Sequence, residues 1–206
     1  MPGPLLAVDA PFVLYRSFFA LPDSIKGRDG HAVNALLGAV GVLACSQATM
    51  NNFIFGDATR QYYETICSGS PAGPGFPGTD AVHTHMTNTR LTDPEVLEFR
   101  YPVLLEDFHI RKDSGGRGQW KAGDGIIRAI RFLEKMECTI LSGHRRVRPF
   151  GLAGGEDGQI GENWVRRRGG RVEQLAGCDA TVIDAGEAIV IQTPTAGGYG
   201  EPQAGS

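Results

Sequence analysis

The sequence lacks paired cysteines, long apolar runs and an excess of charge of either sign. The 20 Lys and Arg residues against 23 Asp and Glu residues leave a net charge of −3, so we expect neither nucleic acid nor an anionic membrane as a partner. The cysteines are far apart and form no C-x-x-C pair, which argues against a zinc knuckle or a redox motif and favours the reducing cytoplasm. They are Cys45, Cys67, Cys138 and Cys178.

No segment is long and apolar enough to cross a bilayer. Residues 4–21 are rich in apolar side chains, but Asp9 and Arg16 interrupt them and no basic region precedes them, so we do not interpret them as a signal peptide. No uninterrupted apolar run approaches the roughly 20 residues of a membrane-spanning helix. The sequence therefore predicts a soluble protein.

Motifs for nucleotide binding and for nucleophilic hydrolysis are also missing. Closely spaced glycines occur at residues 114–118 and 123–125, but their spacing fits neither G-x-x-x-x-G-K-[ST] nor G-x-G-x-x-G before a helix, and tight turns explain them better. No G-x-S-x-G sequence is present, and no cysteine has a base that the sequence identifies. We therefore expect this chain to bind no cofactor firmly by itself.

Glycine is what the sequence has in abundance. Its 29 glycines are roughly twice the average share of about 7%, which favours short strands and tight turns over long helices. We predict a β-rich α+β fold, with short strand and helix segments at the N-terminus followed by a mostly β body with Gly-rich loops. The first strands of this body are expected at residues 53–56, 62–66, 100–105, 126–133 and 138–141, with a helical turn at 94–98.

Turn signals divide the last third of the chain into two strand pairs. Further strands are expected at residues 164–168, 171–175, 181–183 and 188–193. Gly169-Gly170 between the first two predicts a hairpin with a two-residue turn, and residues 184–187 predict a second reversal. The Gly-rich, polar end from residue 195 is expected to fray.

Two histidines give the sharpest local signal for chemistry. His83 and His85 are alternate residues, so on a strand both imidazoles point to one face and can share a metal ion or a substrate carbonyl. Glu64 and Asp80 are further candidates for this site. From the residues alone we favour the alternative that the histidines hydrogen-bond the Gly-rich loop and fix its shape, because no third ligand stands at a readable spacing.

Other polar residues carry weaker signals. Asn51, Asn88 and Thr89 have short side chains suited to hydrogen-bonding an amide or a carbonyl, although turn formation or capping explains each of them singly. Arginines cluster at residues 145–148 and 166–171, but few aromatic residues accompany them. We interpret these clusters as solvated strand faces or a subunit interface rather than a nucleic-acid site.

Several uncommon sequence motifs follow one another after residue 41. They are SQATMNNF (46–53), YYETI (62–66), GTDAVHTHMTNT (78–89), PEVLE (94–98), RYPV (100–103), SGG (114–116) and PFGLAGG (149–155). With these motifs, residues 41–200 resemble the C-terminal part of the hydantoinase B/5-oxoprolinase family.

The resemblance implies an ATP-dependent hydrolase of cyclic amides such as 5-oxoproline or hydantoins. In this family a subunit or domain of hydantoinase A type binds ATP and phosphorylates the substrate, and the B part completes the site together with a divalent metal. The family's metal ligands lie mostly in an N-terminal half that this chain does not contain, so we expect it to need that half or the partner for activity. His83, His85 and Glu64 are the implied catalytic residues, Glu64 as a general base or a structural hydrogen-bonding group. Asn51, Asn88 and Thr89 are the implied substrate-binding residues.

A second, shorter resemblance covers the start of the chain. The words LLAVDA (5–10), LYRSFFALP (14–22) and VNALLGAV (33–40) resemble the beginning of a 5′-3′ exonuclease domain of the DNA polymerase I type. Asp9 matches one of the carboxylates that hold divalent metals there, but the other carboxylates of that cluster are missing. We therefore divide the chain into an incomplete exonuclease-like segment (1–40), an incomplete hydantoinase B region (41–200) and a flexible tail (201–206).

Three functions follow as hypotheses. The first is a fragment of an ATP-dependent cyclic-amide hydrolase that works with a hydantoinase A-type partner. The second is a non-catalytic fused or truncated module that assembles, for example as a homo-oligomer, through apolar surface. The third is a remnant of a metal-dependent nuclease, which predicts metal binding that Asp9→Ala abolishes.

Overall fold

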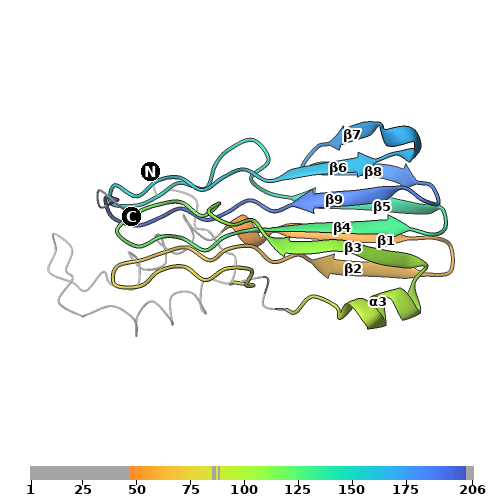
Figure 1. Ribbon diagram of the computed structural model, residues 1–206, viewed down its shortest axis with the longest axis horizontal. Helices are drawn as coiled ribbons and strands as arrows, with labels where there is room; N and C mark the ends of the chain where they lie inside the picture. The colour runs from red at the N-terminus through yellow and green to blue at the C-terminus, as the bar shows by residue number, and fades with distance from the viewer. Residues whose placement is uncertain (1–46, 85–86, 88, 203–206) are drawn as a thin grey trace, which may run out of the picture. The chain divides into compact units, whose positions relative to one another are not determined.

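Two antiparallel sheets form the body of the protein. The structure is a computed structural model that describes residues 47–84, 87 and 89–202. The segment with the exonuclease resemblance, the expected elements before residue 47 and residues 203–206 lie outside the described residues. Figure 1 shows the strands gathered at one end of the described part and long loops extending together from the other.

The first sheet has four strands in the order β2-β1-β5-β8 and the second has five in the order β3-β4-β9-β6-β7. The strands of the first sheet are β1 (Asn51–Gly56), β2 (Gln61–Thr65), β5 (Met136–Ser142) and β8 (Cys178–Ile183). Those of the second are β3 (Val103–Ile110), β4 (Ile126–Phe132), β6 (Glu162–Arg166), β7 (Val172–Leu175) and β9 (Ala188–Gln192). The prediction of a β-rich α+β fold is thereby confirmed.

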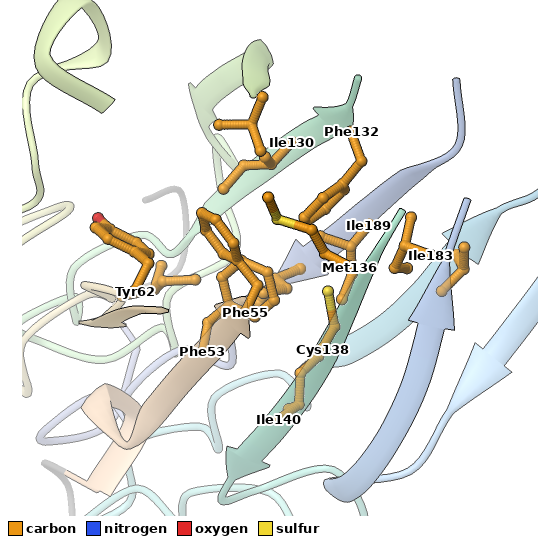
Figure 2. Packing of buried hydrophobic residues seen from close by; sticks show 14 of the residues in the cluster. Phe53, Phe55, Tyr62, Ile130, Phe132, Met136, Cys138, Ile140, Ile183 and Ile189 are labelled. Atoms are coloured by element: carbon orange, nitrogen blue, oxygen red, sulfur yellow. The ribbon is translucent and has the colours of Figure 1, made fainter. Parts of the chain in front are cut away.

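The two sheets pack face to face around one apolar core. Along β5 buried and exposed residues alternate, as expected for a strand with one face on the core. The inward side chains of both sheets meet, and the Phe55 and Phe132 rings lie edge to face with their centroids 5.2 Å apart. Figure 2 shows these rings among isoleucines from both sheets, together with Met136 and Cys138 of β5.

Within the described residues, one short α-helix covers one edge of the sandwich. The helix α3 (Pro94–Arg100) begins at Asp93, whose carboxylate accepts hydrogen bonds from the backbone N–H groups of Glu95 and Val96. Leu97 is its buried residue and anchors it on the core. The predicted helical turn at residues 94–98 is confirmed, and it continues to Arg100.

The strand predicted at residues 100–105 is displaced. Because α3 continues through Arg100, β3 starts at Val103, and it extends to Ile110. Its pairing with β4 shifts between Leu105 and Asp107, so Glu106 forms a bulge that breaks the alternation of the sequence pattern.

The two predicted reversals differ in kind. β6 and β7 form the expected hairpin, but the connection includes the short 3-10 helix η3 (Arg168–Gly170), so it is longer than a two-residue turn. The reversal at residues 184–187 joins β8 to β9, and these strands belong to different sheets. It is therefore a crossing between the layers.

The Gly-rich loops form a compact block in which backbones lie against each other. Backbone hydrogen bonds join segments far apart in sequence, such as Gly78 to Lys121, Gly123 to Ser70 and Gly116 to Ala196. A Cβ atom added at Gly69 would lie 1.8 Å from the carbonyl oxygen of Gly123. Most of the described glycines thus allow two backbone segments to approach each other closely, whereas the sequence pattern predicted them in tight turns.

The prediction that the chain frays from residue 195 is wrong for residues 195–200. Thr195 and Ala196 are fully buried, and the Ala196 carbonyl accepts a hydrogen bond from the Gly116 N–H group. This stretch fills the centre of the Gly-rich block, because only small residues allow the neighbouring segments to close on it. Among the described residues, no helix has the length and apolar character that crossing a membrane requires.

Candidate functional site

The candidate site lies at the edge of the sandwich where β2 and β3 are the outermost strands. Glu64 points inward from β2 and is 5% exposed. Its carboxylate pairs with Arg128 of β4, with Oε1 2.8 Å from Nε and Oε2 3.3 Å from Nη2. The guanidinium of Arg128 in turn lies 5.7 Å from the centre of the Phe108 ring. This ion pair ties the two sheets together at the base of the site.

Tyr62 completes the surroundings of the Glu64 carboxylate. Its hydroxyl donates to Glu64 Oε2 at 2.7 Å and lies 2.7 Å from the hydroxyl of Thr92. Burial first, and then the charge of Glu64, raise the pKa of the Tyr62 phenol, so it stays a hydrogen-bond donor. With Arg128 and Tyr62 both bound to it, Glu64 has the contacts of the structural hydrogen-bonding role that we gave as the alternative to a general base.

His83 lies near this carboxylate with both ring nitrogens unsatisfied. Nδ1 and Nε2 are buried, and neither has a hydrogen-bond partner within the described ranges. Burial lowers the pKa of the imidazole, although the negative charge of Glu64 opposes the shift. The backbone of Thr87 opposes the shift as well, but burial dominates and favours the neutral ring.

A cavity of about 330 Å³ opens beside these groups. Glu64 and Thr89, both expected in the site, line it together. Arg90 lines it as well, and the other side chains of its wall are hydroxyl-bearing: Tyr63, Thr65, Thr87 and Thr92. β2 and the later residues Thr87, Thr89, Arg90 and Thr92 thus meet in one polar pocket.

Asn51 is placed elsewhere, in a network of structural hydrogen bonds. Its Nδ2 donates to the carbonyl oxygens of Ala48 (2.8 Å) and Ile66 (3.2 Å), and its Oδ1 accepts from Arg145 Nη1 at 2.8 Å. Arg145 also donates to Asn163 Oδ1. Burial and the neighbouring Arg111 lower the pKa of Arg145 to about 10. Asn51 therefore holds the start of β1 against the loop after β5, and its role in substrate binding stays a prediction.

The other predicted site residues are distributed as follows. His85, Asn88 and Asp9 lie outside the described residues. The Asp80 carboxylate accepts a hydrogen bond from the Asp124 N–H group at 2.7 Å and so joins two Gly-rich segments.

The described side chains do not fit a divalent metal. Across residues 47–84, 87 and 89–202, no three His, Cys, Asp or Glu side chains gather closely enough to hold an ion. Cys67 has a pKa raised by burial to about 11, so its thiol is not a thiolate ligand at neutral pH. Arg128 already neutralises Glu64.

Sequence reasoning missed Arg128, Tyr62 and Arg90. Arg128 had a readable signal: it is a charged residue inside the apolar run from residue 126 to 133, and such a residue is buried only when it is paired. Its partner Glu64 stands 64 residues earlier in the chain, on a strand of the other sheet, so the sequence alone did not predict this ion pair.

Comparisons with known proteins agree with the fold and extend it to a family. The hydantoinase B/oxoprolinase family matches residues 29–202, starting within the segment assigned above to the exonuclease resemblance. The chain is 46% identical to a 5-oxoprolinase of Dictyostelium discoideum and 47% identical to 5-oxoprolinase 1 of Arabidopsis thaliana, over 82% and 81% of its length. It spans 13% of the length of each of these relatives.

A solved structure supports the same architecture. The ATP-dependent caprolactamase of Pseudomonas jessenii aligns with a TM-score of 0.66 and 23% identity, over 76% of this chain and 30% of that one. At this identity the likeness concerns the fold. By the family match over residues 29–202, the chain belongs to the hydantoinase B/oxoprolinase family.

Proposed function

We propose that the chain is part of an ATP-dependent hydrolase that opens a cyclic amide of the 5-oxoproline type. The observation that supports this proposal is its identity of 46% and 47% to proteins named 5-oxoprolinase. Because the chain spans 13% of their length, we expect its activity to need the missing half or a subunit of hydantoinase A type, which binds ATP.

The site at the sandwich edge gives the chain a chemical part in this reaction. A lactam carbonyl is a poor electrophile, so phosphorylation by the ATP-binding partner makes it an easier target for water. We assign the role of general base toward that water to His83, whose imidazole is buried near the carboxylate of Glu64 and is kept neutral by that burial. Glu64 and Arg128 hold the wall beside it in place.

The test is hydrolysis of 5-oxoproline and hydantoin by the purified chain, alone and with a hydantoinase A-type subunit. We expect ATP-dependent turnover that needs the partner, is lost in His83→Ala/His85→Ala and persists in His109→Ala, a change on the exposed part of β3. The circular dichroism of each variant shows that it is folded. A folded chain without turnover under any of these conditions contradicts the proposal.

A non-catalytic assembly module is the second candidate function. It is favoured by the outer face of the sheet β2-β1-β5-β8, where Ile54, Tyr63, Leu141 and Val182 are 41%, 60%, 54% and 43% exposed. Apolar side chains concentrated on one face of a sheet are typical of an interaction surface. Under this candidate, copies of the chain associate through that face without binding a substrate.

A further inference from the structure

The cavity at the sandwich edge has an unusual balance of charge. The carboxylate of Glu64 in its wall is paired with Arg128, with a shortest N···O distance of 2.8 Å and side chains that are 4% and 2% exposed. Its charge is therefore compensated within the protein. Among the described residues of the wall, Arg90 is the other charged one, so these residues together present a net positive charge to a ligand.

Arg90 is also without a partner in the described part of the chain. Its side chain makes no ion pair and no hydrogen bond with any described residue, as is also the case for Arg100, Arg117, Arg146 and Arg148, whereas seven other arginines lie within 4.0 Å of a carboxylate. These paired arginines are Arg60, Arg128, Arg131, Arg166, Arg167, Arg168 and Arg171. A planar guanidinium with five free donors is suited to bind a carboxylate through two parallel hydrogen bonds.

Size and polarity restrict the ligand further. The volume of about 330 Å³ is at the lower end of the range of roughly 300–1,000 Å³ for ligand pockets, so the cavity suits a small molecule. The hydroxyls of Thr87, Thr89 and Thr92 donate and accept hydrogen bonds, which suits an amide group as well as a carboxylate oxygen.

We propose that this cavity binds a small cyclic amide through its carboxylate, and that Arg90 selects such acids over lactams that lack the carboxylate. The inference rests on the proposed function, because it names the feature by which this site recognises its substrate. Arg90 acts in binding and specificity, whereas His83 carries the chemistry. Binding is therefore measurable in the chain alone, without ATP or a partner.

The experiment measures binding of 5-oxoproline and of 2-pyrrolidinone, the same ring without the carboxylate, by ligand-observed NMR and calorimetry on the full chain. We expect 5-oxoproline to bind at least about 10-fold more tightly, because charge-assisted hydrogen bonds are the strong ones. Arg90→Gln should remove that preference, and Arg90→Lys should restore part of it. Arg117→Gln, which removes an exposed arginine from the Gly-rich block, should change neither affinity.

Three results would overturn the inference: no binding of 5-oxoproline to the folded chain, equal binding of the two compounds, or an unchanged preference in Arg90→Gln. Failure here and failure of the proposed function are distinguishable. If the chain turns over substrate with a partner and Arg90→Gln has an unchanged KM, the hydrolase function is supported and the role of Arg90 in substrate binding is contradicted. Selective binding of 5-oxoproline without turnover would support the role of Arg90 in binding and contradict the proposed hydrolase function.

Discussion

Glu64 and Arg128 form an ion pair that is almost completely removed from water. Their side chains are 4% and 2% exposed, and Tyr62 donates a further hydrogen bond to the carboxylate. Desolvating both charges is costly, so the complete pair adds little net stability, but losing one partner leaves the other charge uncompensated. The pair therefore fixes how β2 and β4 face each other.

Removing one partner of this pair is expected to destabilise the protein strongly. Glu64→Gln keeps the size of the side chain but leaves Arg128 charged and buried, so we expect the free energy of unfolding to fall by about 3–5 kcal/mol. Urea unfolding followed by circular dichroism measures the change. The matched control is Glu134→Gln, because Glu134 pairs with Arg60 at the surface and should leave the midpoint unchanged. Equal midpoints for the two variants would contradict this account.

His83 predicts a pH dependence of stability. Burial lowers the pKa of its imidazole below the ordinary value of about 6.5. Below a pH of about 6.5 the unfolded chain therefore binds more protons at this residue than the folded chain does. The stability that depends on a neutral His83 is present above that pH and is lost as the pH falls through the folded-state pKa.

His83→Gln should make stability less sensitive to acid, because glutamine does not titrate. Between about pH 7 and pH 5 we expect the free energy of unfolding to fall less in this variant than in the wild type. His109→Gln is the comparison for removing a histidine from the surface, since His109 is exposed on β3 beside Asp107. A wild-type slope in His83→Gln would show that burial does not hold this ring neutral.

The sequence indicated candidate residues for the site but not the contacts that these residues make. Glu64 and Thr89 were expected in one site, and the structure brings them to one cavity. Asn51 was expected there too, but its side chain is held by structural hydrogen bonds, one of them to Arg145, which stands 94 residues later in the sequence. Periodicity indicates which way a side chain points, whereas partners on another sheet depend on packing.

At the level of elements, the Gly-rich block has a clear sequence requirement. A Cβ atom at Gly123 would lie 2.0 Å from the carbonyl oxygen of Thr79, which is backbone and therefore cannot rotate away. Gly123→Ala would have to separate two hydrogen-bonded segments, so we expect it to cost more than about 3 kcal/mol, above the usual range for overpacking. Thermal unfolding of the purified variant measures this loss.

A second glycine variant separates crowding from backbone strain. Gly169 has a φ of 80° in the β6–β7 connection and no atom within 4 Å of an added Cβ. Gly169→Ala should therefore cost only the strain of the left-handed conformation, about 1–2 kcal/mol. If the two variants are equally stable, close backbone approach is not what the glycines of the block provide.

The sequence predicted the positions of most strands, but it did not predict to which of the two sheets each strand belongs. The predictions at residues 62–66 and 126–133 nearly coincide with β2 and β4, because apolar alternation and short apolar runs are local signals. The assignment of β8 and β9 to different sheets depends on a crossing at residues 184–187 that looks like any other turn. The buried stretch at residues 195–200 was read as frayed, since small polar residues resemble a loop when their neighbours are unknown.

At the scale of the whole molecule, the outer face of the sheet β2-β1-β5-β8 is a surface with little charge and several exposed apolar side chains. Tyr63, Ile54 and Thr139 lie in register across three strands of this face. Among the outward-facing residues of the four strands, Glu137 is the charged one. Such a surface is typical of an interface, and the chain spans 13% of the length of its 5-oxoprolinase relatives.

If this face mediates assembly, the isolated chain should self-associate through it. We expect the sedimentation coefficient of the wild type to rise with concentration, and Tyr63→Lys/Leu141→Lys to abolish that rise, because two charges would have to be buried in the contact. Val147→Lys is the control, since Val147 is 70% exposed in the loop after β5 and lies outside the sheet. A wild type that sediments as a monomer at every concentration would remove the assembly module as a function of the isolated chain. A rise that also disappears in Val147→Lys would assign the association to charge in general rather than to this face.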